Sequence, residues 1–398
     1  MRIFINAASA HMGGAVTYLK HLLERLPQQL PQQLPQQPPR QEGRGRVVAY
    51  APAATLHQVP TGDRVETRPY PFARTQGLAR LYFDQVVLPL QVQREGGDVL
   101  FSATGFGTLY SPVPQVLLVR NMKYFDPQYY ETRKSLGRSM RRTRLRRWHS
   151  LLSIWAADAV LFPTRAMQAA VEAHISLPPA TTHAVHYGFA ADRAAAGKGP
   201  EGLLPEGLLP EDDGPVLLNV STYAIHKNLE TLVEALPRLR AQHPRLTLVT
   251  TTSRTQTADT AEYDALKARA EALGVEDAWT ELGYVPHGQL FRLYRAADAY
   301  VFPSFTESFG HSMVEAMAAG LPVVAADTAV NREVCAAAGT YFSPFCPADC
   351  ARAVHAVLSA PCRRAHMREA SLQRADAFSW TTHAERLAAL FANVTGRT

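Results

Sequence analysis

Two glutamates and a lysine are the residues of this sequence best suited to chemistry on a charged, hydroxyl-rich ligand. Glu307 and Glu315 are eight positions apart, and Lys227 precedes them. A carboxylate beside a sugar can accept hydrogen bonds from hydroxyls and stabilise positive charge that develops at the anomeric carbon. A carboxylate beside a ribose can bind its two hydroxyls. Taken singly, the two glutamates could equally lie in a solvated loop and on a helix surface, and the lysine could simply be exposed. The residues around them decide whether they form a functional site.

The residues around Glu307 predict a strand, a loop and a helix in succession. An apolar run ending at Phe302 predicts a buried strand, and a helix of small residues follows until Gly320 stops it. Gly310 lies between them, where a residue without a side chain lets a ligand approach the backbone. The first amides of such a helix form an anion site suited to a diphosphate. These amides belong to His311, Ser312 and Met313.

Short apolar runs alternate with amphipathic stretches along nearly the whole chain. Buried strands separated by helices predict parallel sheets with helices on both faces, and 398 residues are too many for one ordinary core. We therefore expect an α/β protein of two Rossmann-like domains. The predicted strands are Arg2–Asn6, Arg46–Tyr50, Asp98–Ser102, Val116–Arg120, Ala159–Phe162, Ala184–Tyr187, Val216–Val220, Leu246–Thr251, Trp279–Leu282, Ala299–Phe302, Pro322–Ala325 and Thr340–Phe342.

Two segments interrupt this rhythm and define the domain organisation. Pro27–Gln41 is rich in proline and glutamine, and Gly199–Asp213 holds a tandem PEGLL repeat, so we expect both to be exposed and mobile. The second separates the two series of strands. We predict an N-terminal domain over 1–190, a linker over 191–214, a C-terminal domain over 215–376 and a helix over 377–398 that returns to the first domain. Such a pair of domains would bind ligands in a cleft between the carboxyl ends of the sheets.

Composition and cysteine content favour a cytoplasmic protein. No run of 18 apolar residues occurs, and the first residues do not resemble a secretory signal. The four cysteines lie in the last quarter of the chain without a second Cys/His pair at zinc-site spacing, so we expect reduced thiols.

A basic stretch suggests an anionic partner. Residues 133–147 include eight Lys or Arg and no acid, and read as a helix they place Leu136, Met140, Trp148, Leu151 and Trp155 on one apolar stripe. A basic amphipathic helix of this kind, over 133–155, is typical of peripheral contact with a membrane, here the inner face of the cell membrane. A surface helix whose tryptophans belong to the core is the alternative. No recognition motif for nucleic acid accompanies the charge.

The motifs together resemble a known family. Phe302-Pro303-Ser304, Glu307-x-Phe309-Gly310, Glu315-Ala316-Met317-Ala318 and Gly320-x-Pro322-Val323-Val324 are similar to the donor-site signature of the family-4 (group 1) retaining glycosyltransferases, whose fold of two Rossmann-like domains is called GT-B. Weaker matches extend over most of the chain. They include Met12-Gly13-Gly14, Ala157-Asp158, Gly188, Lys227-Asn228-Leu229, Glu333 and Phe378-Ser379-Trp380.

The resemblance implies roles for particular residues. Glu307 would contact the transferred sugar near its reacting face, Glu315 would bind the ribose, and Lys227 would offset charge on the leaving diphosphate. The N-terminal domain would face the acceptor. The remaining donor-binding residues that we predict are Gly13, Gly14, Asn121, Thr222, His226, Ser308, Phe309, Gly310, His311 and Ser312. We expect no cofactor and no metal, since no D-x-D motif follows a hydrophobic strand.

Three positions depart from the family pattern and bear on which sugar is bound. Thr222 stands where many relatives have an arginine, with His226 as a second candidate donor. Asn121 stands where many relatives have a histidine, and could bond the same sugar hydroxyl without titrating. Thr250–Thr252 replace a usual glycine.

The resemblance therefore predicts a transferase with nucleotide-sugar and glycan partners. It would move a hexose-type sugar from a nucleotide sugar, UDP- or GDP-linked, to a glycan or lipid-linked acceptor in cell-envelope polysaccharide synthesis. A nucleotide-sugar epimerase or hydrolase on the same fold, and a non-catalytic nucleotide-sugar binding protein, are the alternatives. We expect no nucleic acid partner.

Overall fold

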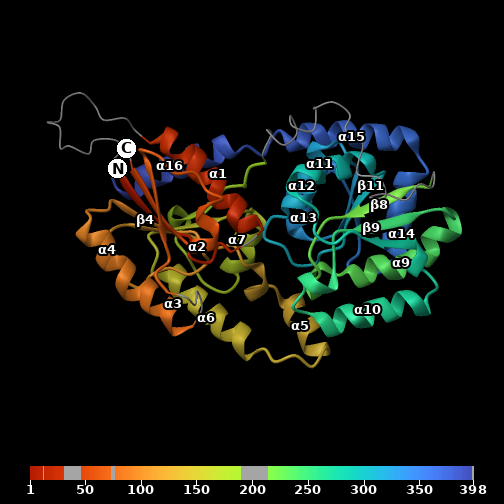
Figure 1. Ribbon diagram of the computed structural model, residues 1–398, viewed down its shortest axis with the longest axis horizontal. Coiled ribbons are helices and arrows are strands. Elements are labelled where there is room, and N and C mark those ends of the chain that lie inside the picture. The colour runs from red at the N-terminus through yellow and green to blue at the C-terminus, as the bar shows by residue number, and fades with distance from the viewer. Residues whose placement is uncertain (12, 31–45, 73–76, 190–213, 397–398) are drawn as a thin grey trace. The chain divides into compact units, whose positions relative to one another are not determined.

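The chain forms two compact α/β units, each with one parallel sheet between helices (Figure 1). The computed structural model describes residues 1–11, 13–30, 46–72, 77–189 and 214–396. Unit 1 comprises Met1–Asp126, Arg133–Gly188 and Ser379–Thr398, and unit 2 comprises Pro127–Thr132 and Phe189–Phe378. The predicted repeat Gly199–Asp213 and most of the linker lie outside the described residues, as do residues 31–41 of the proline- and glutamine-rich segment.

Unit 1 holds a seven-stranded parallel sheet in the order β3-β2-β1-β4-β5-β6-β7. The chain runs outward from β1 through β2 to β3 and then restarts on the other side of β1 with β4, which makes the edge between β1 and β4 the topological switch point. The strands are β1 (Arg2–Asn6), β2 (Arg46–Ala51), β3 (Val65–Pro69), β4 (Val99–Ser102), β5 (Gln115–Leu118), β6 (Ala159–Phe162) and β7 (Thr182–Ala184).

Helices of uneven length cover this sheet. Between α3 and α4 the backbone passes through a π-helical segment, a rare geometry that occurs most often at functional sites. The helices are α1 (Gly14–Gln29), α2 (Ala53–Leu56), α3 (Leu78–Tyr82), the π-helical η1 (Phe83–Val87), α4 (Leu88–Arg94), η2 (Met122–Tyr124), α5 (Pro127–Ser135, which both units share), α6 (Arg141–Trp155), α7 (Arg165–Glu172) and α16 (Trp380–Val394).

The last helix, α16, is part of unit 1. It packs against α1, with the ring centroids of Trp380 and Tyr18 5.7 Å apart, and Phe391 lies against Phe101 of β4. His383 Nδ1 donates to the carbonyl oxygen of His186, so its Nε2 accepts from the Tyr18 hydroxyl at 3.1 Å. Burial lowers the pKa of His383 to about 4, which keeps this ring neutral.

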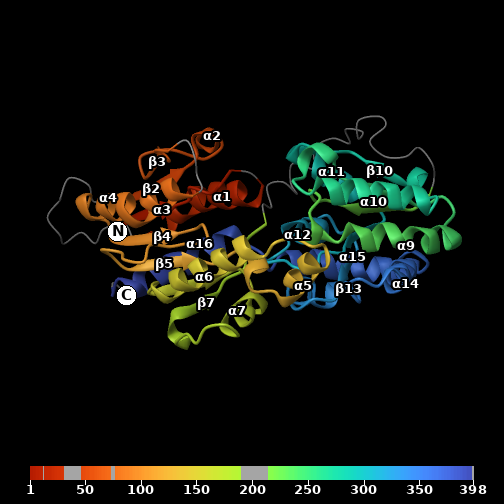
Figure 2. The same cartoon turned by 90° about the horizontal axis from the view of Figure 1, so that it is seen from below.

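Unit 2 repeats the architecture with a six-stranded parallel sheet in the order β10-β9-β8-β11-β12-β13, whose two edge strands, β10 and β13, are labelled in Figure 2. Its switch point lies between β8 and β11. The strands are β8 (Val216–Asn219), β9 (Thr247–Thr250), β10 (Trp279–Glu281), β11 (Ala299–Phe302), β12 (Val323–Ala326) and β13 (Gly339–Phe342). The helices are α9 (Leu229–Gln242), α10 (Thr260–Ala272), α11 (His287–Ala296), α12 (His311–Ala318), α13 (Ala329–Cys335), α14 (Pro347–Leu358) and α15 (Pro361–Ala375).

Three expectations about local structure were wrong. Residues 65–69 form an edge strand that we did not predict, because the polar side chains of Glu66, Thr67 and Arg68 conceal its pattern. The predicted strand Ala184–Tyr187 lies instead at Thr182–Ala184. Residues 27–29, predicted to begin a mobile loop, close the last turn of α1 with Pro27 buried, since the apolar face of that helix continues into this turn.

The basic stretch is also not one helix. It comprises α5 and α6, separated by residues 136–140, and the tryptophans do not belong to the core. Trp148 is 60% exposed and Trp155 is 76% exposed. The helix therefore presents aromatic side chains as well as arginines to its surroundings, which excludes the alternative of a core-facing stripe.

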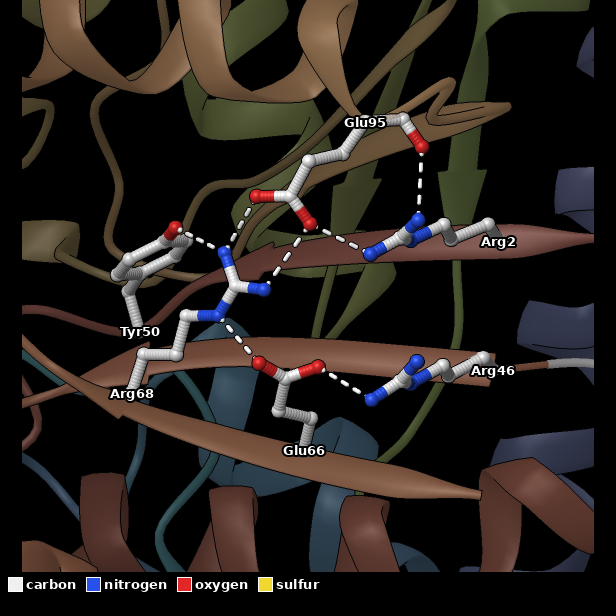
Figure 3. A network of polar contacts seen from close by, with 6 residues as sticks. All are labelled: Arg2, Arg46, Tyr50, Glu66, Arg68 and Glu95. Carbon is white, nitrogen blue, oxygen red and sulfur yellow. Dashed lines mark hydrogen bonds and ion pairs between the residues drawn. The ribbon is translucent and has the colours of Figure 1, made fainter. Parts of the chain in front are cut away.

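A network of ionic contacts ties the β1–β3 edge of the first sheet to the end of α4 (Figure 3). The guanidinium of Arg68 donates twice to the Glu95 carboxylate, at 2.6 and 2.9 Å, and Arg2 Nη2 donates to the same carboxylate at 2.5 Å. Hydrogen bonding from Arg68 lowers the pKa of Glu95. The side chains drawn in the network are Arg2, Arg46, Tyr50, Glu66, Arg68 and Glu95.

We expect Glu95→Gln to lower the free energy of unfolding by about 1–2 kcal/mol at neutral pH, because charge-assisted bidentate bonds are the stronger kind. Since the pKa of Glu95 is lowered in the folded state, its contribution is present above the pKa of the unfolded glutamate and is lost as the pH falls through the folded value. Urea unfolding of both proteins should therefore show a smaller difference at about pH 3 than at neutral pH.

Asp264→Asn provides the matched control for Glu95→Gln. Asp264 also receives a bidentate pair of bonds, from Arg254 at 2.7 and 2.9 Å, but both side chains are at least half exposed. Water screens such a pair, so this variant should unfold with wild-type stability. If both variants lost the same free energy of unfolding, the partial burial of Glu95 would not explain its contribution.

Candidate functional site

The structure brings Lys227 and Glu307 together at the switch point of unit 2. Lys227 lies at the end of a short 3₁₀ turn after β8, and Glu307 lies in the loop after β11. Because β8 and β11 are neighbouring parallel strands, both loops leave the same edge of the sheet. Positions far apart in the sequence thus meet where such sheets bind ligands.

Side-chain amides hold the two loops together. Asn219, the last residue of β8, donates to the carbonyl oxygen of Val301, and Asn228 donates to that of Pro303 at 3.2 Å. The amide of Phe305 in turn donates to the carbonyl oxygen of His226 at 3.1 Å. Asn228 has a positive φ of 53°, which turns the chain sharply from the lysine into α9. The loop that carries Lys227 is therefore fixed against the loop that carries Glu307.

Lys227 and Glu307 form an ion pair within the site. The distance from Lys227 Nζ to Glu307 Oε1 is 2.5 Å, and the two side chains are 21% and 13% exposed. The same ammonium lies 5.6 Å from the centroid of the Phe302 ring. The ammonium and the carboxylate thus lie side by side with little exposure to solvent. Each is able to bind a ligand group of the opposite charge.

Gly310 begins α12, and only glycine suits its position. Its φ of 83° lies in the left-handed region, and a Cβ atom there would stand 2.4 Å from Met313 Cε. The amide of Met313 donates to the Gly310 carbonyl oxygen at 3.0 Å, so one of the three amides that we assigned to the anion site is engaged within the protein.

Glu315 lies in the second turn of α12 and has a structural partner. The Tyr294 hydroxyl donates to Glu315 Oε2 at 3.0 Å. Complete burial, with Glu315 nearby, raises the pKa of Tyr294, so the phenol stays protonated and orients this carboxylate. This contact from α11 was not evident in the sequence.

The other predicted donor-binding residues of unit 2 lie in the same two loops or at the start of α12. Thr222 is exposed after β8, whereas the imidazole of His226 is buried, with its ring centroid 6.4 Å from that of Tyr129. Phe309 is buried against His311 and Phe378. Ser308, His311 and Ser312 are partly buried.

Three predicted residues belong to unit 1. Gly13 and Gly14 start α1 and are exposed, and Gly13 has a φ of 59°, with open space where a Cβ atom would stand. Asn121 follows β5 and lines a cavity of about 410 Å³. Their roles towards a donor stay predictions.

That cavity also contains residues that sequence reasoning missed. Arg80 and Asp84 form an ion pair at 2.6 Å on α3 and η1, and His149 of α6 faces the same space. The spacing of four between arginine and aspartate was visible, but it is common on helix surfaces and did not single them out. No group of three or more metal-ligating His, Cys, Asp or Glu side chains gathers within the described part of either unit.

Two Rossmann-like units, each with a polar cluster at the carboxyl ends of its strands, define the fold class of this chain. Residues 204–374 match the family model described as "Glycosyl transferases group 1", and this match confirms the resemblance seen in the sequence. A D-inositol 3-phosphate glycosyltransferase from Segniliparus rotundus is 37% identical over 133 residues, 32% of this chain and 29% of that protein. The matches span less than half the length of the curated relatives.

Solved structures match the fold over the whole chain. A sucrose-phosphate synthase from Thermosynechococcus elongatus superposes with a TM-score of 0.73 at 17% identity and covers 100% of both chains. The Anabaena protein HepE, in complex with UDP-glucose, superposes with a TM-score of 0.68 at 18% identity and covers 99% of both. The chain therefore has the GT-B fold that the sequence predicted.

Proposed function

We propose that this protein is a retaining glycosyltransferase that moves a hexose-type sugar from a nucleotide sugar to a glycan or lipid-linked acceptor without a metal ion. The observation that carries the proposal is the Lys227–Glu307 pair at the switch point of a group 1 glycosyltransferase unit. A nucleotide sugar presents both kinds of partner that this pair needs. Its diphosphate is anionic, and its anomeric carbon becomes positive as the bond to the leaving group breaks.

Different residues of the site bind the nucleotide diphosphate and the sugar of the donor. Lys227 binds the diphosphate and offsets the charge that grows on it as it leaves, the role that a divalent metal fills elsewhere. Glu307 accepts hydrogen bonds from the sugar and stabilises its positive charge in the transition state. Glu315, oriented by Tyr294, binds the ribose hydroxyls, and the start of α12 after Gly310 faces the phosphates.

Release of free nucleotide from a panel of UDP-, GDP-, ADP- and dTDP-sugars, with and without EDTA, tests this proposal. We expect one donor to be turned over equally in both conditions. UDP-glucose is the first to try, since the fold neighbour HepE was solved with it. Loss of turnover in EDTA would contradict metal independence. Conversion of the sugar without transfer to any added acceptor would favour a nucleotide-sugar epimerase or hydrolase. Binding of a donor without turnover would favour a non-catalytic nucleotide-sugar binding protein.

We further propose that α6 contacts an anionic membrane, which would place the protein at the inner membrane face and suit a role in cell-envelope polysaccharide synthesis. Leu145, Trp148 and Trp155 lie at helical spacing on one exposed side of a helix that also carries five arginines. In the described residues no helix is long and apolar enough to cross a bilayer. In a flotation assay with vesicles containing anionic lipid, the wild type should float with the vesicles and the double variant Trp148→Glu/Trp155→Glu should stay at the bottom. Failure of the wild type to float at low salt would exclude the contact.

A further inference from the structure

A cavity of about 410 Å³ in unit 1 has the position of a ligand site. Ser9 follows β1, Thr104 and Phe106 follow β4, and Asn121 follows β5, so the cavity opens at the carboxyl ends of three neighbouring strands. It includes the edge between β1 and β4, which is the switch point of this sheet. The π-helical turn η1 forms another side and places Asp84 in the cavity.

The cavity has a polar floor whose charges balance. Arg80 Nε donates to Asp84 Oδ2 at 2.6 Å, and Asn6 Nδ2 donates to Asp84 Oδ1 at 2.8 Å. Arg80 Nη2 donates to Asn6 and Thr104, while its Nη1 forms no hydrogen bond with any described residue. A guanidinium and a carboxylate held against each other offer donors and acceptors but little net charge, which suits a neutral hydroxyl-bearing ligand rather than an ion.

His149 adds a polar group that the protein does not itself satisfy. Its ring lies parallel to that of Phe106, with centroids 4.7 Å apart, and its Nε2 is buried without a partner among the described residues. Burial lowers its pKa, so the ring is neutral and can either donate to or accept from a hydroxyl. Buried polar atoms normally have partners, and a ligand hydroxyl, with a small shift of the ring, would supply one.

The mouth of the cavity is apolar. Leu81 of α3 and Leu145 of α6 line it and are 43% and 66% exposed. The same two helices also expose Leu78, at 84%, and Trp148, at 60%. Arg146 is a cationic group at the lining, on the same helix. The cavity therefore combines buried polar groups with exposed apolar side chains.

We propose that this cavity binds the acceptor, and that the acceptor is an amphiphile with a neutral hydroxylated head at Arg80, Asp84 and His149 and an apolar group between Leu81 and Leu145. The proposal rests on the proposed function, because it names the acceptor class of that reaction. Both parts contribute to binding, because Arg80, Asp84 and His149 supply hydrogen bonds and Leu81 and Leu145 supply apolar contact.

Titration calorimetry with short alkyl glycosides below their micelle concentrations tests the proposal. Hexyl β-glucoside should bind at least about tenfold more tightly than methyl β-glucoside, because the hexyl chain is removed from water at the mouth. Hexyl phosphate, which has the tail and an anionic head, should bind more weakly than hexyl β-glucoside. Equal affinities for hexyl and methyl β-glucoside, or tighter binding of hexyl phosphate, would overturn the proposed acceptor class.

Variants locate the binding. His149→Phe keeps the stack on Phe106, removes the ring nitrogens and should weaken hexyl β-glucoside binding about fivefold. Leu145→Asp changes an exposed residue, so the fold should tolerate it, and should weaken binding about tenfold. His183→Phe is the control, since His183 is a partly buried histidine of the same unit outside this cavity whose pKa burial also lowers.

Wild-type affinity in both His149→Phe and Leu145→Asp would overturn the assignment of the cavity. The titration contains no nucleotide, so it fails or succeeds independently of the donor site. A protein that turns over a donor but binds no alkyl glycoside would keep the proposed function and lose this inference, whereas one that turns over no donor would lose the proposed function first.

Discussion

Glu307→Gln is expected to lower kcat/KM for sugar transfer by about 10²–10³-fold, because a neutral amide cannot stabilise positive charge at the anomeric carbon as a carboxylate does. The substitution keeps the size of the side chain, so the loop should stay in place. Most of the loss should appear in kcat, since the charge develops only in the transition state. Steady-state kinetics on the donor identified by nucleotide release would measure both parameters.

Glu281→Gln is the control for this effect. Glu281 also pairs with a lysine of unit 2, Lys267, at 2.7 Å, but at the end of edge strand β10 rather than at the switch point. The Glu281→Gln enzyme should therefore keep the wild-type kcat/KM. Lys227→Met should be as damaging as Glu307→Gln, and the double variant should lose less than the two single losses combined, because the residues act as a unit. A Glu307→Gln enzyme within about threefold of wild type would remove this glutamate from the mechanism.

Gly310→Ala is expected to have the second largest effect and to act on both stability and activity. The left-handed φ of 83° disfavours alanine, and its Cβ would collide with Met313 Cε. Together these effects should lower the free energy of unfolding by about 1–3 kcal/mol. Because the backbone at residue 310 must leave its left-handed φ or the buried Met313 side chain must repack, the amides at the start of α12 should shift and kcat/KM should fall about 10–100-fold.

Two further variants separate the causes. Gly274→Ala meets a similar φ of 63° in open space, so it should lose about 1 kcal/mol of stability and no activity. Gly310→Ala/Met313→Ala removes the collision and leaves the backbone preference, so part of the activity should return. Full activity in Gly310→Ala at reduced stability would show that the start of α12 does not position the donor.

The local structure around Glu307 could be predicted because its signals are close together in the sequence. Strand, loop, glycine and helix follow one another between Phe302 and Gly320, and each has a recognisable residue pattern. The ion pair of Lys227 with Glu307 was not predicted, since the resemblance assigned the two residues only separate roles in one donor site, and it follows from two loops that leave neighbouring strands of a parallel sheet. The Tyr294–Glu315 bond could not be predicted, because nothing in the spacing of α11 and α12 fixes which side chains meet.

Unit 1 was less predictable for physical reasons. Its polar floor combines Asn6, Arg80, Asp84 and Thr104, which come from β1, the α3–η1 segment and the loop after β4. A π-helical turn shifts the phase of the helix by one residue, so a periodicity of 3.6 does not place Asp84 in the cavity. Strand β3 was missed because it is an edge strand with polar side chains.

The packing of α16 on α1 affects how the protein can be made. Unit 1 takes Trp380, Leu387 and Phe391 into its core, yet these residues follow all of unit 2 in the chain. A ribosome that adds about 5–20 residues per second needs on the order of 10–40 s to synthesise the segment between them. Throughout that interval the nascent unit 1 exposes the apolar surface against which α16 later packs. We therefore expect chaperones to bind this surface until α16 has been synthesised, while most of unit 2 can already fold.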